Sequence, residues 1–318
     1  MIKLLCLALS KLHKSILLGI LILYSLSYSY SIALADDDLP RGSFSLSLGE
    51  QRPAVPFPAL QNFNTELTQQ GTGPGFTVAV SRHHIIPYNV LRAFYNTVIT
   101  SGHLIYLRGF LNAMGDNING YVGAARMDCS SSTGTVNMAL NMMSSMRLGL
   151  IMNSSPGDYP DGLDDFHSFY VWLPGNLFIG PNNRSDDPGD AFEENAAYIV
   201  GVNRYARLLR AYNFMRDYNS DHQLSHLQGA VRELSIIARE RSIHPLVSAE
   251  WTRGEDGKYA INTKESRQTR SISVNKVAND MDDDSITSNE IQECNIQSRA
   301  IRKFNAAIYN SLFPLLLQ

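Results

Sequence analysis

The sequence predicts an α+β protein in which a mostly helical scaffold carries a small embedded element of two strands and a helix. Three observations predict it. Residues 76–82 alternate apolar and polar side chains, which is the period of a half-buried strand. Residues 88–99 and 223–243 repeat apolar side chains at helical spacing. A second strand-like run, 169–181, precedes a pattern typical of a helix start. Apolar residues make up 44% of the 318, enough for a substantial core.

The first 35 residues have the pattern of a secretory signal peptide. Lys3, Lys11 and Lys14 lie ahead of the apolar run 16–24, and the small-x-small site Ala33-Leu34-Ala35 precedes three aspartates. We therefore expect residues 1–35 to be removed and the mature protein to be secreted or periplasmic, with no stable membrane association. An uncleaved membrane anchor is the alternative interpretation.

Charge and cysteine content limit the classes of partner. Without the three lysines of the signal, 24 basic and 30 acidic residues remain, a net charge of −6. No global positive charge favours nucleic acid, so any such contact requires a local basic patch. Cys6 is lost with the signal, and the remaining Cys129 and Cys294 predict one disulfide in an oxidising compartment, with two separate thiols as the alternative.

The mature chain divides into three parts. Residues 36–75 are loop-rich, with Pro40, Pro53, Pro56 and Pro58 and a glycine cluster. Residues 76–250 contain the predicted strands 76–82 and 176–180 and most of the predicted helices. Residues 251–318 form a polar and acidic segment followed by a C-terminal helix, expected to pack on the same domain. The expected helices are 88–99, 138–152, one that begins at Asp187 with Pro188 in its first turn, 223–243 and 297–317.

The side chains that could carry chemistry lie in two short stretches. "RHHIIP" places His83 and His84 where the first strand stops, and adjacent strand residues point to opposite sides, so one imidazole could face a metal and the other a substrate. "GNLFIGPNNRSDDPGD" supplies the amide of Asn176, the cation of Arg184 and oxygen ligands at Asn183, Asp186, Asp187 and Asp190. Metal-assisted phosphodiester cleavage needs these groups: ligands, a basic histidine, a side chain that fixes its tautomer, and a positive charge.

These two stretches resemble the HNH, or ββα-metal, nuclease superfamily, in particular its exported bacterial toxin-like branch. The resemblance implies a ββα-metal nuclease-like domain within residues 76–250. His83 would bind the metal, His84 would be the general base and Asn176 would orient His84. Asn183 or Asp187 would complete the metal site, and Arg184 would clamp the phosphate. The interval of 92 residues from His84 to Asn176 requires a helical insertion.

The same resemblance implies a cofactor and partners. The oxygen-rich ligand set favours Mg²⁺, Mn²⁺ or Ca²⁺ over Zn²⁺. The substrate would be nucleic acid, either DNA or RNA, and a toxin role would add an immunity protein as a partner. His167 could join the metal site, although we expect it to be a surface or loop histidine.

Two other classes of function remain open from the sequence. A toxin-like N-glycosidase or transferase would use Arg232 and Glu233, with Trp251 as a stacking platform. An exported non-enzymatic binding or adhesion module would tolerate substitution of His83 and His84. The sequence contains neither a G-x-S-x-G elbow nor an H-E-x-x-H motif, which argues against the common serine hydrolases and zincins.

Overall fold

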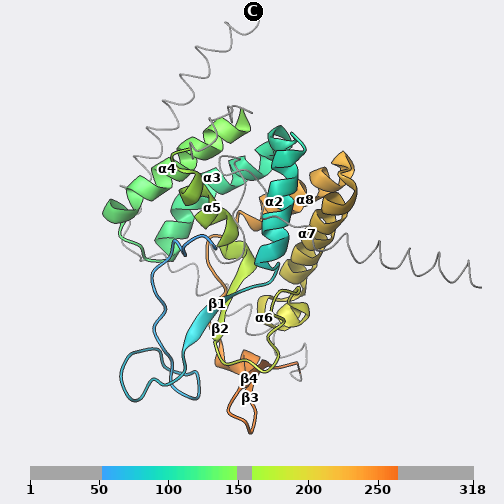
Figure 1. Cartoon of the computed structure of the whole chain (residues 1–318). Helices are drawn as coiled ribbons and strands as arrows, with labels where there is room; N and C mark the ends of the chain where they lie inside the picture. Colours follow the sequence, from blue (N-terminus) through green and yellow to red (C-terminus); the bar gives the residue numbers. More distant parts are fainter. Residues whose placement is uncertain (1–51, 149–159, 264–318) are drawn as a thin grey trace, which may run out of the picture.

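A computed structural model describes residues 52–148 and 160–263, and Figure 1 shows a layer of helices above two small sheets. The α+β class and its mostly helical character are confirmed. The α-helices are α2 (Tyr88–Thr100), α3 (Arg108–Ala124), α4 (Cys129–Arg147), α5 (Leu163–Val171), α6 (Ala197–Val200), α7 (Val202–Asp221) and α8 (Leu224–Ile237). The 3-10 helices are η2 (Leu104–Leu107), η3 (Pro174–Asn176), η4 (Glu194–Ala196) and η5 (Ser248–Glu250). The strands are β1 (Val80–His84), β2 (Leu177–Pro181), β3 (Trp251–Arg253) and β4 (Tyr259–Ile261).

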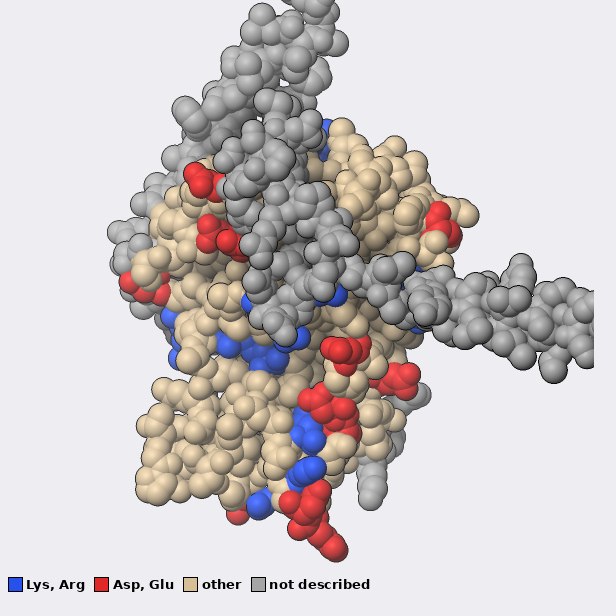
Figure 2. Space-filling model, viewed as in Figure 1, with Lys and Arg blue, Asp and Glu red and all other residues tan. Residues whose placement is uncertain are grey.

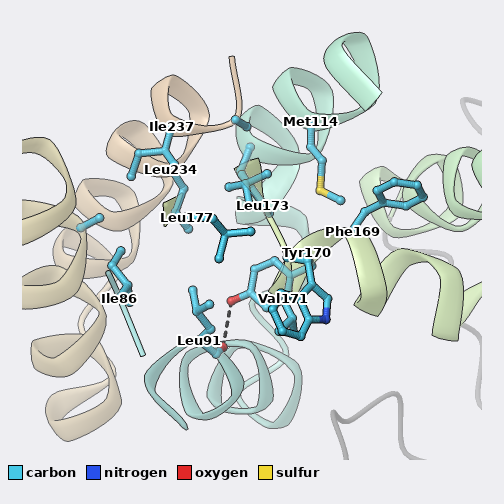
Figure 3. Packing of buried hydrophobic residues seen from close by; sticks show 14 of the residues in the cluster. Ile86, Leu91, Met114, Phe169, Tyr170, Val171, Leu173, Leu177, Leu234 and Ile237 are labelled. Atoms are coloured by element: carbon cyan, nitrogen blue, oxygen red, sulfur yellow. Dashed lines mark hydrogen bonds between the residues drawn. The ribbon is translucent and has the colours of Figure 1, made fainter. Parts of the chain in front are cut away.

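The helices pack around one apolar core. Helix α7 lies along α8 and α2, and α3 packs between α8 and α4, which in turn contacts α5. Figure 3 shows Leu177 of β2 packed among Leu234 and Ile237 of α8 and Leu173, which follows α5. The Tyr170 hydroxyl donates a hydrogen bond to the carbonyl oxygen of Leu91, 2.8 Å away, and so joins α5 to α2. One face of β2 is therefore anchored in the helical layer.

Strands β1 and β2 pair in antiparallel register, with His83 opposite Phe178 and His84 opposite Leu177. The chain between them forms α2, α3, α4 and α5, as the expected helical insertion requires. The main chain of His244 then pairs with β2, because Ile179 N–H donates to the His244 carbonyl at 2.9 Å. The two histidines are the last residues of β1, which begins and ends later than the expected strand 76–82.

The second sheet, β3 and β4, covers the other face of β2. The ring of Trp251 lies 6.2 Å from that of Phe178, and a side chain at Gly180 would come within 2.5 Å of Trp251. Glycine is therefore required where the indole lies on the strand. This hairpin was not anticipated in the polar stretch that starts at residue 251.

Three local predictions were wrong. No helix begins at Asp187: its carboxylate accepts the N–H of Gly189, 2.8 Å away, in a turn, and the next regular helices are α6 and α7. Aspartate often closes such a turn instead of capping a helix. The strand-like run from residue 169 starts as the end of α5, and the strand begins only at Leu177. His167 is 2% exposed within α5, so it is neither a surface nor a loop residue.

Several expectations fall on residues outside the described ranges. These are the signal peptide 1–35, most of the acidic segment, the helix 297–317 and Cys294, and with it the disulfide to Cys129. Among the helices of residues 52–148 and 160–263, none is long and apolar enough to span a bilayer.

Candidate functional site around His83 and His84

The two adjacent imidazoles point to opposite sides of β1, as the alternation of a strand predicts. His83 stacks on Phe178, with ring centroids 5.2 Å apart, on the side covered by Trp251. His84 lies against Trp172, with centroids 4.7 Å apart, on the side of the helical layer. The two rings therefore lie in different surroundings, one beside the second sheet and the other beside the end of α5.

The position of the proton on His84 follows from its hydrogen bond. Its Nε2 lies 3.0 Å from the carbonyl oxygen of Val171, which can only accept, so Nε2 carries the proton and Nδ1 keeps a lone pair. Burial lowers the pKa of His84 to about 4, and Arg52 and His83 also lower it, against the raising effect of the Val171 carbonyl. At neutral pH this imidazole is therefore uncharged, with Nδ1 as its basic atom.

His83 has a similar arrangement on the other side of the strand. Its Nε2 lies 3.1 Å from the carbonyl oxygen of Pro181 and 3.2 Å from the Ser81 hydroxyl. Burial and the charge of Arg184 lower its pKa, whereas Asp187 raises it. Metal-binding histidines commonly donate their second N–H to a carbonyl in this way, so Nδ1 of His83 is suited to a ligand role.

Asn176 contacts the strand end but not the ring of His84. Its Oδ1 accepts the N–H of Ile86 at 2.7 Å and its Nδ2 donates to the Ile86 carbonyl at 2.9 Å. The Ile85 N–H bonds in turn to the main-chain oxygen of Asn176 at 3.0 Å. Asn176 thus holds the backbone just after His84, and the group that fixes the tautomer of His84 is the Val171 carbonyl.

Arg184 is buried and engaged with two carboxylates. Its Nη2 lies 2.7 Å from Glu193 and its Nε 3.0 Å from Asp186, and none of its side chain is exposed. Its guanidinium also lies over the rings of Phe178 and Trp251. Asp186 further accepts the N–H of Ile261 in β4. This cation ties the loop after β2 to the second sheet.

The expected metal ligands are brought together only in part. Asp187 and Asn183 are exposed, Asp187 acts electrostatically on His83, and the main-chain oxygen of Asn183 accepts the N–H of Tyr259. In the part of the chain that the structure describes, no three His, Cys, Asp or Glu side chains form a group that could hold a metal. A site here would consist of His83, Asp187, the Asn183 amide and water.

The residues of the rival glycosidase reading are arranged differently. Glu233 is buried in α8 and pairs with Arg210 at 3.1 Å and Arg232 at 3.4 Å. Burial would raise the pKa of Glu233, but the hydrogen bond and charge of Arg210 lower it overall, so the carboxylate is ionised rather than a proton donor. Trp251 is 7% exposed and has both Phe178 and Arg184 against it, which leaves little ring surface for stacking.

Sequence reasoning missed three groups near the strands. The Val171 carbonyl is a backbone atom and has no signature in residue type. Arg52 lies in the loop-rich segment and acts on His84 from there. His244 forms a pair with Glu250, its Nε2 3.1 Å from the carboxylate, on the edge of β2 away from β1. For the pair of His244 and Glu250, the only signal in the sequence was a histidine that has apolar neighbours and is followed by Pro245.

Comparisons with known proteins give one curated relative to report. The chain is 33% identical over 238 residues to "Putative protein p9" of Acyrthosiphon pisum secondary endosymbiont phage 1. The match covers 70% of this chain and 62% of that protein, so the chain spans less than two thirds of its relative's length. No family model matches the chain, and no solved structure matches it significantly. The relative's name states no activity.

Proposed function

We propose that this protein hydrolyses phosphodiester bonds of nucleic acid, with His84 as the general base. The observation that carries the proposal is the hydrogen bond from His84 Nε2 to the Val171 carbonyl. It leaves Nδ1 unprotonated, and the lowered pKa keeps the ring neutral at neutral pH. A general base must be unprotonated and held in one orientation, and both conditions are met here. The resemblance of "RHHIIP" and "GNLFIGP" to ββα-metal nucleases is the second support.

In the proposed reaction, Nδ1 of His84 accepts a proton from water while the water oxygen attacks phosphorus. The bond from phosphorus to the leaving sugar oxygen breaks, and that oxygen takes a proton from solvent. Val171 stabilises the imidazolium that forms, because its carbonyl oxygen accepts the Nε2–H of the charged ring more strongly. Asn176 keeps the backbone next to His84 in place.

A divalent ion at His83 would lie on the opposite face of β1 from His84, and its positive charge would act on the phosphate across the strand rather than by direct contact. His83, through Nδ1, and Asp187 would hold it, with Asn183 as a third donor. One imidazole, one carboxylate and an amide oxygen leave room for several waters, a donor set that suits Mg²⁺, Mn²⁺ or Ca²⁺. The fit is supported by the Nε2 bond of His83 to the Pro181 carbonyl and by the effect of Asp187 on the pKa of His83.

The proposed place of action is outside the cytoplasm, on the strength of the signal pattern in residues 1–35. Two biological roles fit an exported nuclease: scavenging of extracellular nucleic acid, and a toxin, which would require an immunity protein. Cleavage assays with DNA and with RNA distinguish the two substrates.

The test is cleavage of plasmid DNA and of structured RNA by the purified protein with Mg²⁺, Mn²⁺, Ca²⁺ or EDTA. The variant is His84→Ala, and the matched control is His226→Ala. His226 lies in the first turns of α8 and pairs with Asp221 at the end of α7. We expect metal-dependent cutting by the parent and the control and none by His84→Ala. Normal cutting by His84→Ala would refute His84 as the base. If the parent cuts neither substrate, the proposed nuclease activity is refuted and a non-enzymatic binding module is favoured.

A further inference from the structure

The face of β1 that carries His84 is lined with arginines. Val80, Arg82 and His84 share this face because strand side chains alternate. The guanidinium of Arg52 lies over the ring of Tyr88, 4.8 Å from its centroid, and 5.9 Å from that of Trp172. Figure 2 shows basic side chains gathered over the region where Figure 1 labels β1 and β2.

Arg52 is held in place by contacts with two aromatic rings. Trp172 donates its Nε1–H to the main-chain oxygen of Pro53, 2.9 Å away, and this bond fixes the segment that carries Arg52 against the ring that also packs on His84. Contact with ring faces orients a guanidinium but uses none of its N–H donors. Arg52 is exposed, and among the described residues no carboxylate pairs with it.

Two more arginines lie beside it. Arg92 of α2 lies over Tyr88, 5.7 Å from the centroid, so that two guanidinium groups share this ring. Arg82 lies over Phe57 and donates to the Pro58 carbonyl, which holds the same N-terminal segment to β1. Arg184, by contrast, is buried on the opposite side of the sheet with Glu193 and Asp186. The exposed guanidinium of Arg52 is therefore on the side of the predicted base.

We propose that Arg52, with Arg92 and Arg82 beside it, binds the sugar-phosphate backbone of nucleic acid next to His84. This inference rests on the proposed function for its substrate class and replaces Arg184 as the phosphate-binding group. Guanidinium groups that flank an aromatic ring present forked donors suited to phosphate oxygens. Such contacts carry no sequence information, so binding is independent of base sequence and sensitive to salt.

The experiment measures binding separately from cleavage. The full chain carrying His84→Ala is titrated into labelled single-stranded and duplex oligonucleotides of two unrelated sequences, at several salt concentrations. Arg52→Ala and Arg92→Ala are added singly to this background. The matched control is Arg216→Ala, since Arg216 is an exposed arginine over the ring of Tyr212, 5.5 Å from its centroid, on α7. A methylphosphonate oligonucleotide, which lacks the backbone charge, is the probe for phosphate recognition.

Loss of Arg52 should weaken binding about tenfold for both sequences and lower the slope of log K against log salt by about 1. The control should change neither quantity, and the methylphosphonate probe should bind far more weakly. The proposal would be overturned if Arg52→Ala and its parent had the same affinity and the same salt slope. Tight binding of the uncharged probe would also overturn it. So would a parent that binds no nucleic acid. If these binding effects are found and the unmutated chain cuts nothing, the proposed nuclease activity is refuted, whereas the phosphate-binding surface is supported.

Discussion

His84 in β1 donates its Nε2–H to the carbonyl oxygen of Val171, the last residue of α5, at 3.0 Å. The final carbonyls of a helix have no partner within the helix, so this bond also satisfies one end of α5. A single contact thus joins the helical layer to the strand and selects the nitrogen of His84 that carries the proton.

The pH dependence of cleavage should reflect the low pKa of His84. The base works only when unprotonated, and burial lowers its pKa from 6.5 to about 4. The rate should therefore stay level from neutral pH through 6.5 and fall only as the pH approaches about 4. Single-turnover cleavage across this range, with circular dichroism to confirm folding, measures it. A midpoint near 6.5 would show that the base is an imidazole exposed to water.

Replacing Asn176 with Ala should reduce the free energy of unfolding by about 2–5 kcal/mol, because it leaves the buried N–H and C=O of Ile86 without their side-chain partners. The control is Asn64→Ala, whose hydrogen bonds to Thr68 are exposed and whose effect should be within about 0.5 kcal/mol. Urea denaturation of both variants measures the difference. Equal small effects would mean that Asn176 is not needed to hold the strand end.

Arg184 should prove to be a stabilising residue. Arg184→Met leaves Glu193 buried without its cation and should cost about 3–5 kcal/mol of unfolding free energy. Adding Glu193→Met should restore part of that loss, since the unpaired charge is then gone. Arg210→Met is the comparison, because its side chain is 50% exposed and Glu233 keeps Arg232 at 3.4 Å, so the loss should be at most about 1 kcal/mol. A double variant as unstable as the sum of the two single ones would contradict this coupling.

Gly180→Ala should destabilise the protein by about 1–3 kcal/mol, because the added methyl would lie 2.5 Å from Trp251 and 3.1 Å from His83. The same shift should weaken Mn²⁺ binding at His83. Gly134→Ala is the matched control: no atom lies within 4 Å of the added methyl in α4, and the change should be neutral or stabilising by up to about 1 kcal/mol. Thermal unfolding of the two variants compares them, and equal stability would mean that Trp251 is free to move.

The parts of the site that follow from local periodicity could be predicted from the sequence. A strand places His83 and His84 on opposite sides whatever the rest of the fold does. We expected Asn176 near the strand end because the stretches that contain His84 and Asn176 were treated as one paired element. Strands β1 and β2 do pair. The helical spacing of residues 88–99 matches α2 closely, because its apolar stripe faces the core.

The failures have equally specific causes. Asp187 closes a turn with Gly189 because a short carboxylate can bond to a nearby N–H as readily as it can cap a helix. Phe169 and Tyr170 suit a strand by composition, but in α5 Tyr170 packs against Tyr95 and bonds to Leu91, and Phe169 packs against Phe57. Arg184 has the expected charge but finds Glu193 nine residues along, a partner that only the folded loop provides.

The long insertion between β1 and β2 has a consequence for folding kinetics. His84 and its partner Val171 are 87 residues apart, so their contact requires closure of a loop that includes α2, α3, α4 and α5. Closing long loops is entropically costly, and contacts between distant residues form late and slowly. His84 therefore acquires its fixed tautomer only once the helical layer is assembled, and a partly folded chain carries both histidines without the hydrogen bond that orients His84.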